Sequence, residues 1–88
     1  MTIKIYKREG CAYCDQTIRY IENHGATYKL IDMTTNQQLG HEVATAAHSI
    51  NVPVVTIADS PSEFTHENMY VGWNIPKLNQ FIKAVKGE

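Results

Sequence analysis

The sequence has few of the features that mark large functional classes of proteins. Its 88 residues include only two cysteines and one tryptophan, and its formal net charge is −1. It has no basic cluster of the kind that forms a nucleic-acid-binding surface. No segment approaches the ~20 apolar residues of a membrane-spanning helix, and the first residues lack the charged-then-apolar order of a signal peptide. We therefore expect one cytoplasmic, monomeric domain over residues 1–88, with neither nucleic acid nor membrane as a partner.

Both cysteines lie in one short motif, Cys11-Ala12-Tyr13-Cys14. If a helix begins after Gly10, Cys11 lies at its N-terminal edge, where free backbone N–H groups and the helix dipole stabilise a thiolate. In Cys-X-X-Cys motifs the thiol pKa falls from ~8.5 to roughly 3.5–7.5. Cys14 lies one turn further along and can form a disulfide with Cys11. The pair can therefore carry out thiol–disulfide exchange.

Two other uses of a Cys-X-X-Cys pair stay open. It is also half of a tetrahedral zinc site, but such sites usually need a second pair of ligands. The histidines include no close pair that would supply them: His24, His41, His48 and His66. A purely structural disulfide would close a very short loop and stabilise the fold little. We favour a redox role and predict no metal ligands.

Hydrophobic periodicity predicts strands and helices in alternation. Residues 2–7 and 27–32 alternate apolar and polar positions, as strands do. Residues 12–24 form an apolar helical face that ends before Gly25. A strand, a helix and a strand within about thirty residues indicate a right-handed crossover with parallel strands. The cysteines then lie at the carboxyl end of the first strand, where open α/β sheets place their chemistry.

The second half of the chain continues the pattern. After possible capping residues at 34–36, a second helix is predicted from its apolar face, formed by Leu39, Val43, Ala46, Ala47 and Ile50. Residues 50–58 are rich in β-branched side chains and predict a third strand. Residues 69–71 predict a fourth strand, paired with the third in a hairpin. A last helix follows Asn74 and Pro76, with an apolar face formed by Leu78, Phe81, Ile82 and Val85.

Together these features resemble the thioredoxin fold in its small glutaredoxin form. The order β-α-β-α-β-β-α, the Cys-X-X-Cys at the first strand-to-helix turn and Val52-Pro53 before the third strand carry the resemblance. Within that family the chain is similar to the glutaredoxin-like NrdH-redoxins, hydrogen donors of ribonucleotide reductase. Four segments match in order: residues 3–14, 22–25, 52–55 and 72–78. The resemblance implies an α/β fold with a four-stranded mixed sheet flanked by helices.

The resemblance also implies roles for residues at the motif and before the third strand. Cys11 matches the attacking cysteine, Cys14 the resolving cysteine, and Tyr13 the aromatic residue over the pair. Pro53 matches the cis-proline beside the disulfide. The Val52 backbone would then face the disulfide and pair with an extended substrate.

Further candidates for partner binding lie on either side of these positions. Gly72 matches the glycine that lets a partner or glutathione come close. Trp73 is either packing or a contact residue, since large aromatics dominate binding hot spots. Lys7 and Arg8 are either solvated charges at a strand end or, near Cys11, groups that favour its thiolate and the docking of an acidic partner tail.

One departure from the family bears on the electron source. Glutaredoxins that bind glutathione typically carry Gly-Gly and then an acidic pair at this point, whereas Gly72-Trp73-Asn74 has no acid. We therefore expect a dithiol donor that reduces protein disulfides, with ribonucleotide reductase as its partner. The electron source is thioredoxin reductase or glutathione, and no cofactor is tightly bound beyond the redox-active disulfide. The alternatives are a glutathione-dependent glutaredoxin, which Tyr13 favours, and a metal or iron–sulfur binding module.

Overall fold

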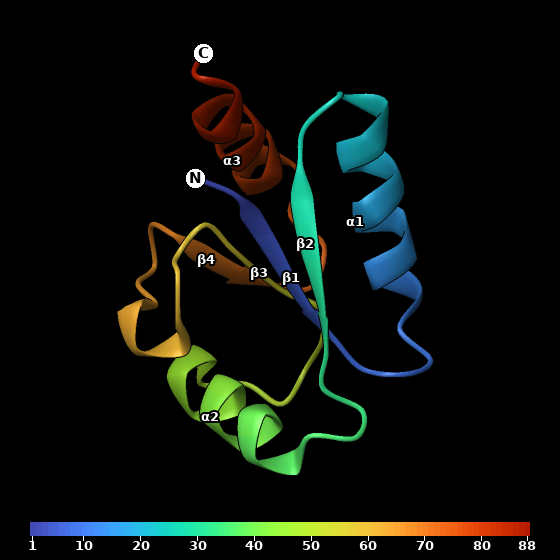
Figure 1. The fold of residues 1–88 in the computed structure, drawn as a ribbon, viewed down its shortest axis with the longest axis vertical. Helices are drawn as coiled ribbons and strands as arrows, with labels where there is room; N and C mark the ends of the chain where they lie inside the picture. The colour runs from blue at the N-terminus through green and yellow to red at the C-terminus, as the bar shows by residue number, and fades with distance from the viewer.

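The chain forms a four-stranded sheet covered by helices on both faces (Figure 1). The structure is a computed structural model that describes residues 1–88. Its elements are β1 (Ile3–Lys7), α1 (Ala12–Asn23), β2 (Tyr28–Asp32), α2 (Gln37–Ala47), β3 (Val54–Thr56), the short 3-10 helix η1 (Pro61–Glu63), β4 (Met69–Val71) and α3 (Ile75–Lys86). Apart from η1, this is the predicted order.

The strands are arranged as β2-β1-β3-β4. β1 and β2 are parallel, and β3 is antiparallel to both β1 and β4. The predicted parallel crossover, hairpin and mixed sheet are therefore confirmed. Tyr6 pairs with Val54, and Val54 pairs with Val71. The segments that follow β1, precede β3 and follow β4 therefore lie together at the same end of the strands.

Two apolar clusters hold the helices to the two faces. Ile3 and Ile5 of β1 pack with Ile21 of α1 and with the buried face of α3, formed by Leu78, Phe81 and Ile82. On the other face, Tyr6 and Val54 pack with Val43 of α2. Successive strand residues point to opposite faces, so the alternating pattern of β1 builds both clusters.

The predicted helix boundaries are confirmed where capping residues define them. Gly25 follows α1 with a φ of +69°, a value that glycine adopts without steric cost. Asn36 and Asn74 each accept a backbone hydrogen bond at 3.1 Å, from Leu39 N and Lys77 N. α1 ends at Asn23, one residue earlier than predicted.

Two expectations were wrong in detail. α2 ends at Ala47, followed by His48 with a φ of +55°, and Ile50 is 78% exposed instead of lying on the helix face. β3 covers only Val54–Thr56 instead of residues 50–58, because the loop turns through Pro53, which has no N–H to donate to a strand. None of the helices combines the length and apolar character required to cross a membrane.

Candidate functional site

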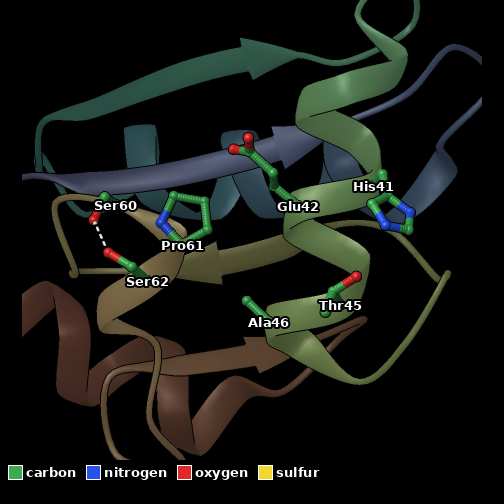
Figure 2. Close-up of a pocket in the computed structure, with 7 residues that line it drawn as sticks. All are labelled: His41, Glu42, Thr45, Ala46, Ser60, Pro61 and Ser62. Atoms are coloured by element: carbon green, nitrogen blue, oxygen red, sulfur yellow. Dashed lines mark hydrogen bonds between the residues drawn. The ribbon is translucent and has the colours of Figure 1, made fainter.

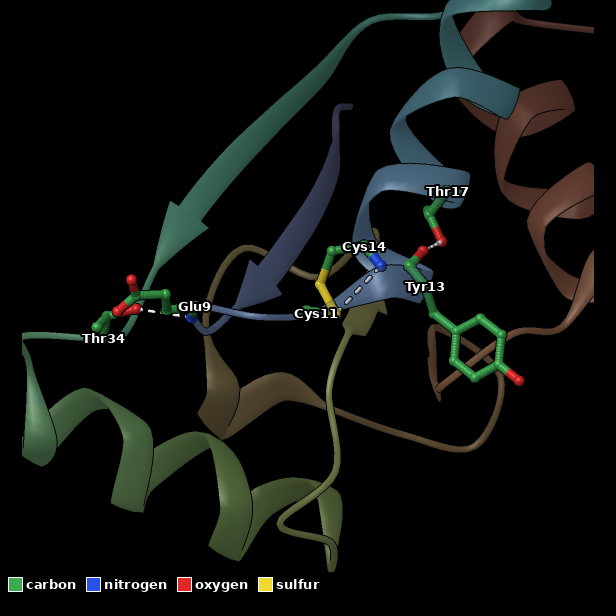
Figure 3. Close-up of a disulfide and its surroundings, with 6 residues drawn as sticks. All are labelled: Glu9, Cys11, Tyr13, Cys14, Thr17 and Thr34. Atoms are coloured by element: carbon green, nitrogen blue, oxygen red, sulfur yellow. Dashed lines mark hydrogen bonds between the residues drawn. A yellow bond between two sulfur atoms is a disulfide. The ribbon is translucent and has the colours of Figure 1, made fainter.

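The two cysteines form a disulfide at the start of α1 (Figure 3). Cys11 is the N-cap residue, with extended backbone angles, and its Sγ accepts a hydrogen bond of 3.1 Å from Cys14 N. Cys11 is half-buried, whereas Cys14 is completely buried. Of the two cysteines, Cys11 is therefore the one with surface open to solvent, and its sulfur faces a backbone donor.

A hydrogen-bonded turn holds the segment that leads into the cysteines. Glu9 N donates to Thr34 Oγ1 at 2.9 Å, and Thr34 N donates to Asp32 Oδ1 at 2.9 Å. The hydrogen bonds from Thr34 hold the pKa of Asp32 below its ordinary value. Figure 3 shows Glu9 and Thr34 on one side of the disulfide and the Tyr13 ring on the other. The turn before Cys11 is thus fastened to the end of β2.

The segment before β3 and the segment after β4 are joined at the same end of the strands. The Val52–Pro53 peptide bond is cis, as the family resemblance implied, and the Pro53 ring is buried. Gly72 N donates to Pro53 O at 2.8 Å, and Gly72 has a φ of +85°. The left-handed backbone at Gly72 favours glycine on conformational grounds.

Two aromatic side chains, one between the cysteines and one directly after Gly72 in the sequence, are exposed. Tyr13 is 50% exposed and Trp73 is 39% exposed. The Trp73 ring meets the Tyr20 ring edge-on, with centroids 6.1 Å apart. Tyr20 in turn donates a hydrogen bond of 2.6 Å to Asn79 Oδ1 on α3. The contact with Tyr20 confirms that Trp73 takes part in packing, and its role as a contact residue for a partner stays a prediction.

Arg8 lies at the end of β1, but its side chain turns toward α2. Its Nη1 donates to the carbonyl oxygen of Ile50 at 3.3 Å, and the guanidinium lies against Gly40. From the sequence, Arg8 is either a solvated charge at a strand end or, near Cys11, a group that favours its thiolate and the docking of an acidic partner tail. In the structure it bridges parts of the chain that are far apart in sequence.

The two pockets of the molecule lie away from the disulfide. The larger, of about 440 Å³, separates α2 from the η1 segment (Figure 2) and is lined by His41, Glu42, Thr45, Ala46, Ser60, Pro61 and Ser62. The other, of about 280 Å³, lies near the end of α2 between Ala47 and Phe64. Neither is lined by a cysteine, and no three His, Cys, Asp or Glu side chains gather in a group that could hold a metal ion.

Comparison with models of protein families shows which family this chain belongs to. A family model described as Glutaredoxin matches residues 3–61. The chain belongs to the glutaredoxin family. The match includes the Cys-X-X-Cys motif and the cis-proline, so the disulfide at the N-terminus of α1 is the redox group of a thiol–disulfide oxidoreductase.

A solved structure supports the fold of this glutaredoxin. The crystal structure of the glutaredoxin (grx-1) from Archaeoglobus fulgidus is 21% identical in sequence and superposes with a TM-score of 0.72. The similarity covers 92% of this chain and 85% of that chain. It shows that the architecture is the thioredoxin fold of glutaredoxins. A search of curated proteins gave no match.

Three residues contribute to the glutaredoxin site in ways that the sequence does not predict. The sequence suggests only a capping role for Thr34 and assigns no role in the site to Tyr20 or Gly40. Each acts through a partner distant in sequence: Glu9, Trp73 and Arg8 respectively. Only Gly40 gave a signal, because a glycine inside a helix costs up to ~1 kcal/mol relative to alanine.

Proposed function

We propose that this glutaredoxin is a dithiol electron donor that reduces disulfides in protein partners. The observation that carries the proposal is the unequal exposure of the two cysteine residues. Cys11 is half-buried at the N-terminus of α1 and faces Cys14 N, whereas Cys14 is completely buried. The helix dipole and the N–H group favour negative charge on Cys11. Cys11 is thus the attacking residue and Cys14 the resolving residue.

The proposed reaction transfers two electrons in two steps. The Cys11 thiolate attacks one sulfur of the substrate disulfide, forms a mixed disulfide and releases the other substrate sulfur as a thiolate. Cys14 then loses its proton and attacks Cys11 Sγ. The second substrate sulfur leaves as a thiolate, the Cys11–Cys14 disulfide forms, and the two substrate thiolates take up protons. An external reductant must supply two electrons and two protons to restore the dithiol.

The proposed substrate site lies at the end of the strands where the segments after β1, before β3 and after β4 come together. The Val52 backbone precedes the cis-proline Pro53 and offers hydrogen bonds to an extended peptide. Gly72 allows the peptide to approach, and the exposed parts of Tyr13 and Trp73 offer apolar contact. Large aromatics with one open face are frequent anchors in protein interfaces.

The partner and electron source of the proposal follow the NrdH-type resemblance. Trp73 stands where glutathione-binding glutaredoxins typically have a second glycine, and the first turn of α3 contains no acidic residue. This supports thioredoxin reductase as the electron source and ribonucleotide reductase as the protein substrate. We place this activity in the cytoplasm and assign it to residues 1–88 acting as a monomer.

The decisive experiment is a coupled NADPH-oxidation assay with two alternative donor systems. One contains thioredoxin reductase, and the other contains glutathione and glutathione reductase. We expect turnover with a protein disulfide in the thioredoxin reductase system. Turnover with only the glutathione system would reject the proposed electron source and identify a glutathione-dependent glutaredoxin.

The Cys14→Ser variant separates the two mechanisms independently of the electron source. In the dithiol mechanism this variant forms the mixed disulfide but does not resolve it, so reduction of protein disulfides stops. A glutathione-dependent enzyme needs Cys11 alone and would retain removal of glutathione from mixed disulfides. Retained reduction of protein disulfides by Cys14→Ser would contradict the assigned role of Cys14.

A further inference from the structure

Arg8 connects the redox loop, which we define as residues 8–11 between β1 and α1, to the loop that carries Pro53. A Cβ atom placed on Gly40 would lie 3.1 Å from Arg8 Nη2 and 3.9 Å from its Nε. The guanidinium therefore rests on the backbone of α2 at the one position in that helix that has no side chain. From there Nη1 reaches the carbonyl oxygen of Ile50. A planar guanidinium with several donors suits this bridging position.

The loop that Arg8 reaches has little else to hold it at Ile50. The Ile50 side chain is 78% exposed and contributes no apolar anchor. The neighbouring hydrogen bond, from Asn51 N to Ser49 Oγ, is local. The bond from Arg8 spans 42 positions of the sequence. It therefore fixes the loop relative to β1 and not merely relative to itself.

Adjacent residues fasten both ends of α2 to the redox loop. Arg8 holds the loop after α2, while Glu9 N donates to Thr34 in the loop before α2. The start of the redox loop, α2 and the loop before β3 are consequently one connected unit. Val52, two residues further on, packs against the apolar cluster that contains Val43 and Val54, so this packing and the Arg8 hydrogen bond restrain the loop at two nearby points.

We propose that Arg8 is a positioning residue that holds the Ile50 carbonyl and so presents the Val52–Pro53 backbone to an extended protein substrate. Gly40 is the second part of this device because it gives the guanidinium room to lie against α2. The inference rests on the proposed function, in which the Val52 backbone binds the substrate. It assigns Arg8 no contact with the reacting sulfur atoms.

The test combines a double-mutant cycle with two substrates of different size. Reduction of insulin disulfides reports on protein-substrate binding, and alkylation of Cys11 by iodoacetamide across a pH series reports on the thiolate. In Arg8→Ala we expect KM for insulin to rise about fivefold, as for loss of one hydrogen bond to a charged donor. The pH profile of alkylation stays in place. Arg19→Ala, which removes a charge from the exposed face of α1, is the matched control and leaves KM unchanged.

Gly40→Ala keeps the charge of Arg8 but displaces its guanidinium. We expect it to raise KM in the same direction by a smaller factor, and to add nothing in the Arg8→Ala background. Additive effects of the two substitutions would overturn the proposal. So would a shift of the alkylation profile in Arg8→Ala, because the charge would then act on Cys11 directly.

Amide hydrogen exchange separates this inference from the proposed function. The Asn51 amide, which donates to Ser49 Oγ, should exchange faster in Arg8→Ala and in Gly40→Ala than in the wild type. If the wild type does not reduce insulin, the proposed function fails, and the exchange rates still decide whether Arg8 fixes the loop. Unchanged exchange in both variants would refute the positioning role.

Discussion

Among single residues, Tyr70 is notable because its buried hydroxyl has no hydrogen-bond partner. Its ring packs near Phe81, with centroids 5.7 Å apart. Tyr70→Phe keeps this ring and removes a polar group that loses its hydration on folding. We expect the free energy of unfolding to increase by about 1 kcal/mol, as measured by urea denaturation.

Tyr20→Phe is the matched control for that substitution. The Tyr20 hydroxyl donates to Asn79 Oδ1 at 2.6 Å, so its removal leaves an acceptor without its donor. We expect a decrease of roughly 1 kcal/mol in the same assay. The two variants should therefore shift the urea midpoint in opposite directions, and a destabilised Tyr70→Phe would show that the Tyr70 hydroxyl is satisfied after all.

Tyr70 also makes stability depend on alkaline pH. Burial raises the pKa of the Tyr70 phenol above its ordinary value of 10.0. Above pH ~10 the unfolded chain loses this proton while the folded chain keeps it. The contribution of the protonated Tyr70 phenol to the free energy of unfolding is therefore fully present below pH ~10. Above that pH it declines, by up to roughly 1.4 kcal/mol for each pH unit. Urea titrations from pH 8 to 11 should show a shallower decline for Tyr70→Phe than for the wild type, and identical slopes would contradict the assignment.

Among the elements, α2 and α3 begin with the same capping geometry. Asn36 and Asn74 each accept a hydrogen bond of 3.1 Å from the backbone three residues ahead. Replacing either by alanine should lower the free energy of unfolding by about 1 kcal/mol. Asn74→Ala should also disturb the neighbouring Trp73, which its fluorescence spectrum can report.

Aspartate provides the control for both caps. Its carboxylate can accept the same hydrogen bond and is favoured at a helix N-terminus. Asn36→Asp and Asn74→Asp should therefore retain wild-type stability in urea denaturation. If the aspartate variants are as unstable as the alanine variants, the side chains matter for packing and not as caps.

The elements could be predicted because their determinants are local. The alternation at Ile3 and Ile5, the apolar spacing in α3 and the caps at Gly25 and Asn74 all act within a few residues. Ile50 was misplaced because it continues the apolar spacing of α2 beyond the real end of the helix at Ala47. Neither spacing nor composition reveals that His48 adopts a left-handed backbone and ends the helix.

At the scale of the whole molecule, the site was predicted only in part. The Cys11–Cys14 pair is adjacent in sequence, and the family resemblance indicated Pro53 and Gly72. The contacts that hold these parts together join residues far apart in sequence, such as Arg8 with Gly40 and Tyr20 with Trp73. Such contacts depend on how the helices pack on the sheet, which the spacing of residues in one segment does not determine.

A carrier that cycles between disulfide and dithiol must keep its fold in both forms, and the position of the cores indicates that it does. The larger apolar cluster contains neither cysteine. The disulfide joins residues three positions apart, so by loop entropy its contribution is about 2 kcal/mol or less. We expect reduction to lower the free energy of unfolding by no more than this. Urea denaturation with and without dithiothreitol, followed by the single tryptophan, should give two cooperative transitions.

The same two transitions measure how the fold tunes the redox pair. By a thermodynamic cycle, the oxidised and the reduced protein differ in unfolding free energy by an amount set by the change in reduction potential of the pair on folding. The conversion is that of a two-electron couple. About 1.4 kcal/mol corresponds to 30 mV. The variant with both Cys11→Ser and Cys14→Ser is the control, since its midpoint should not respond to dithiothreitol. Loss of the cooperative transition on reduction would contradict a fold that is independent of the disulfide. A small difference in midpoint would instead mean that folding changes the reduction potential of the pair little.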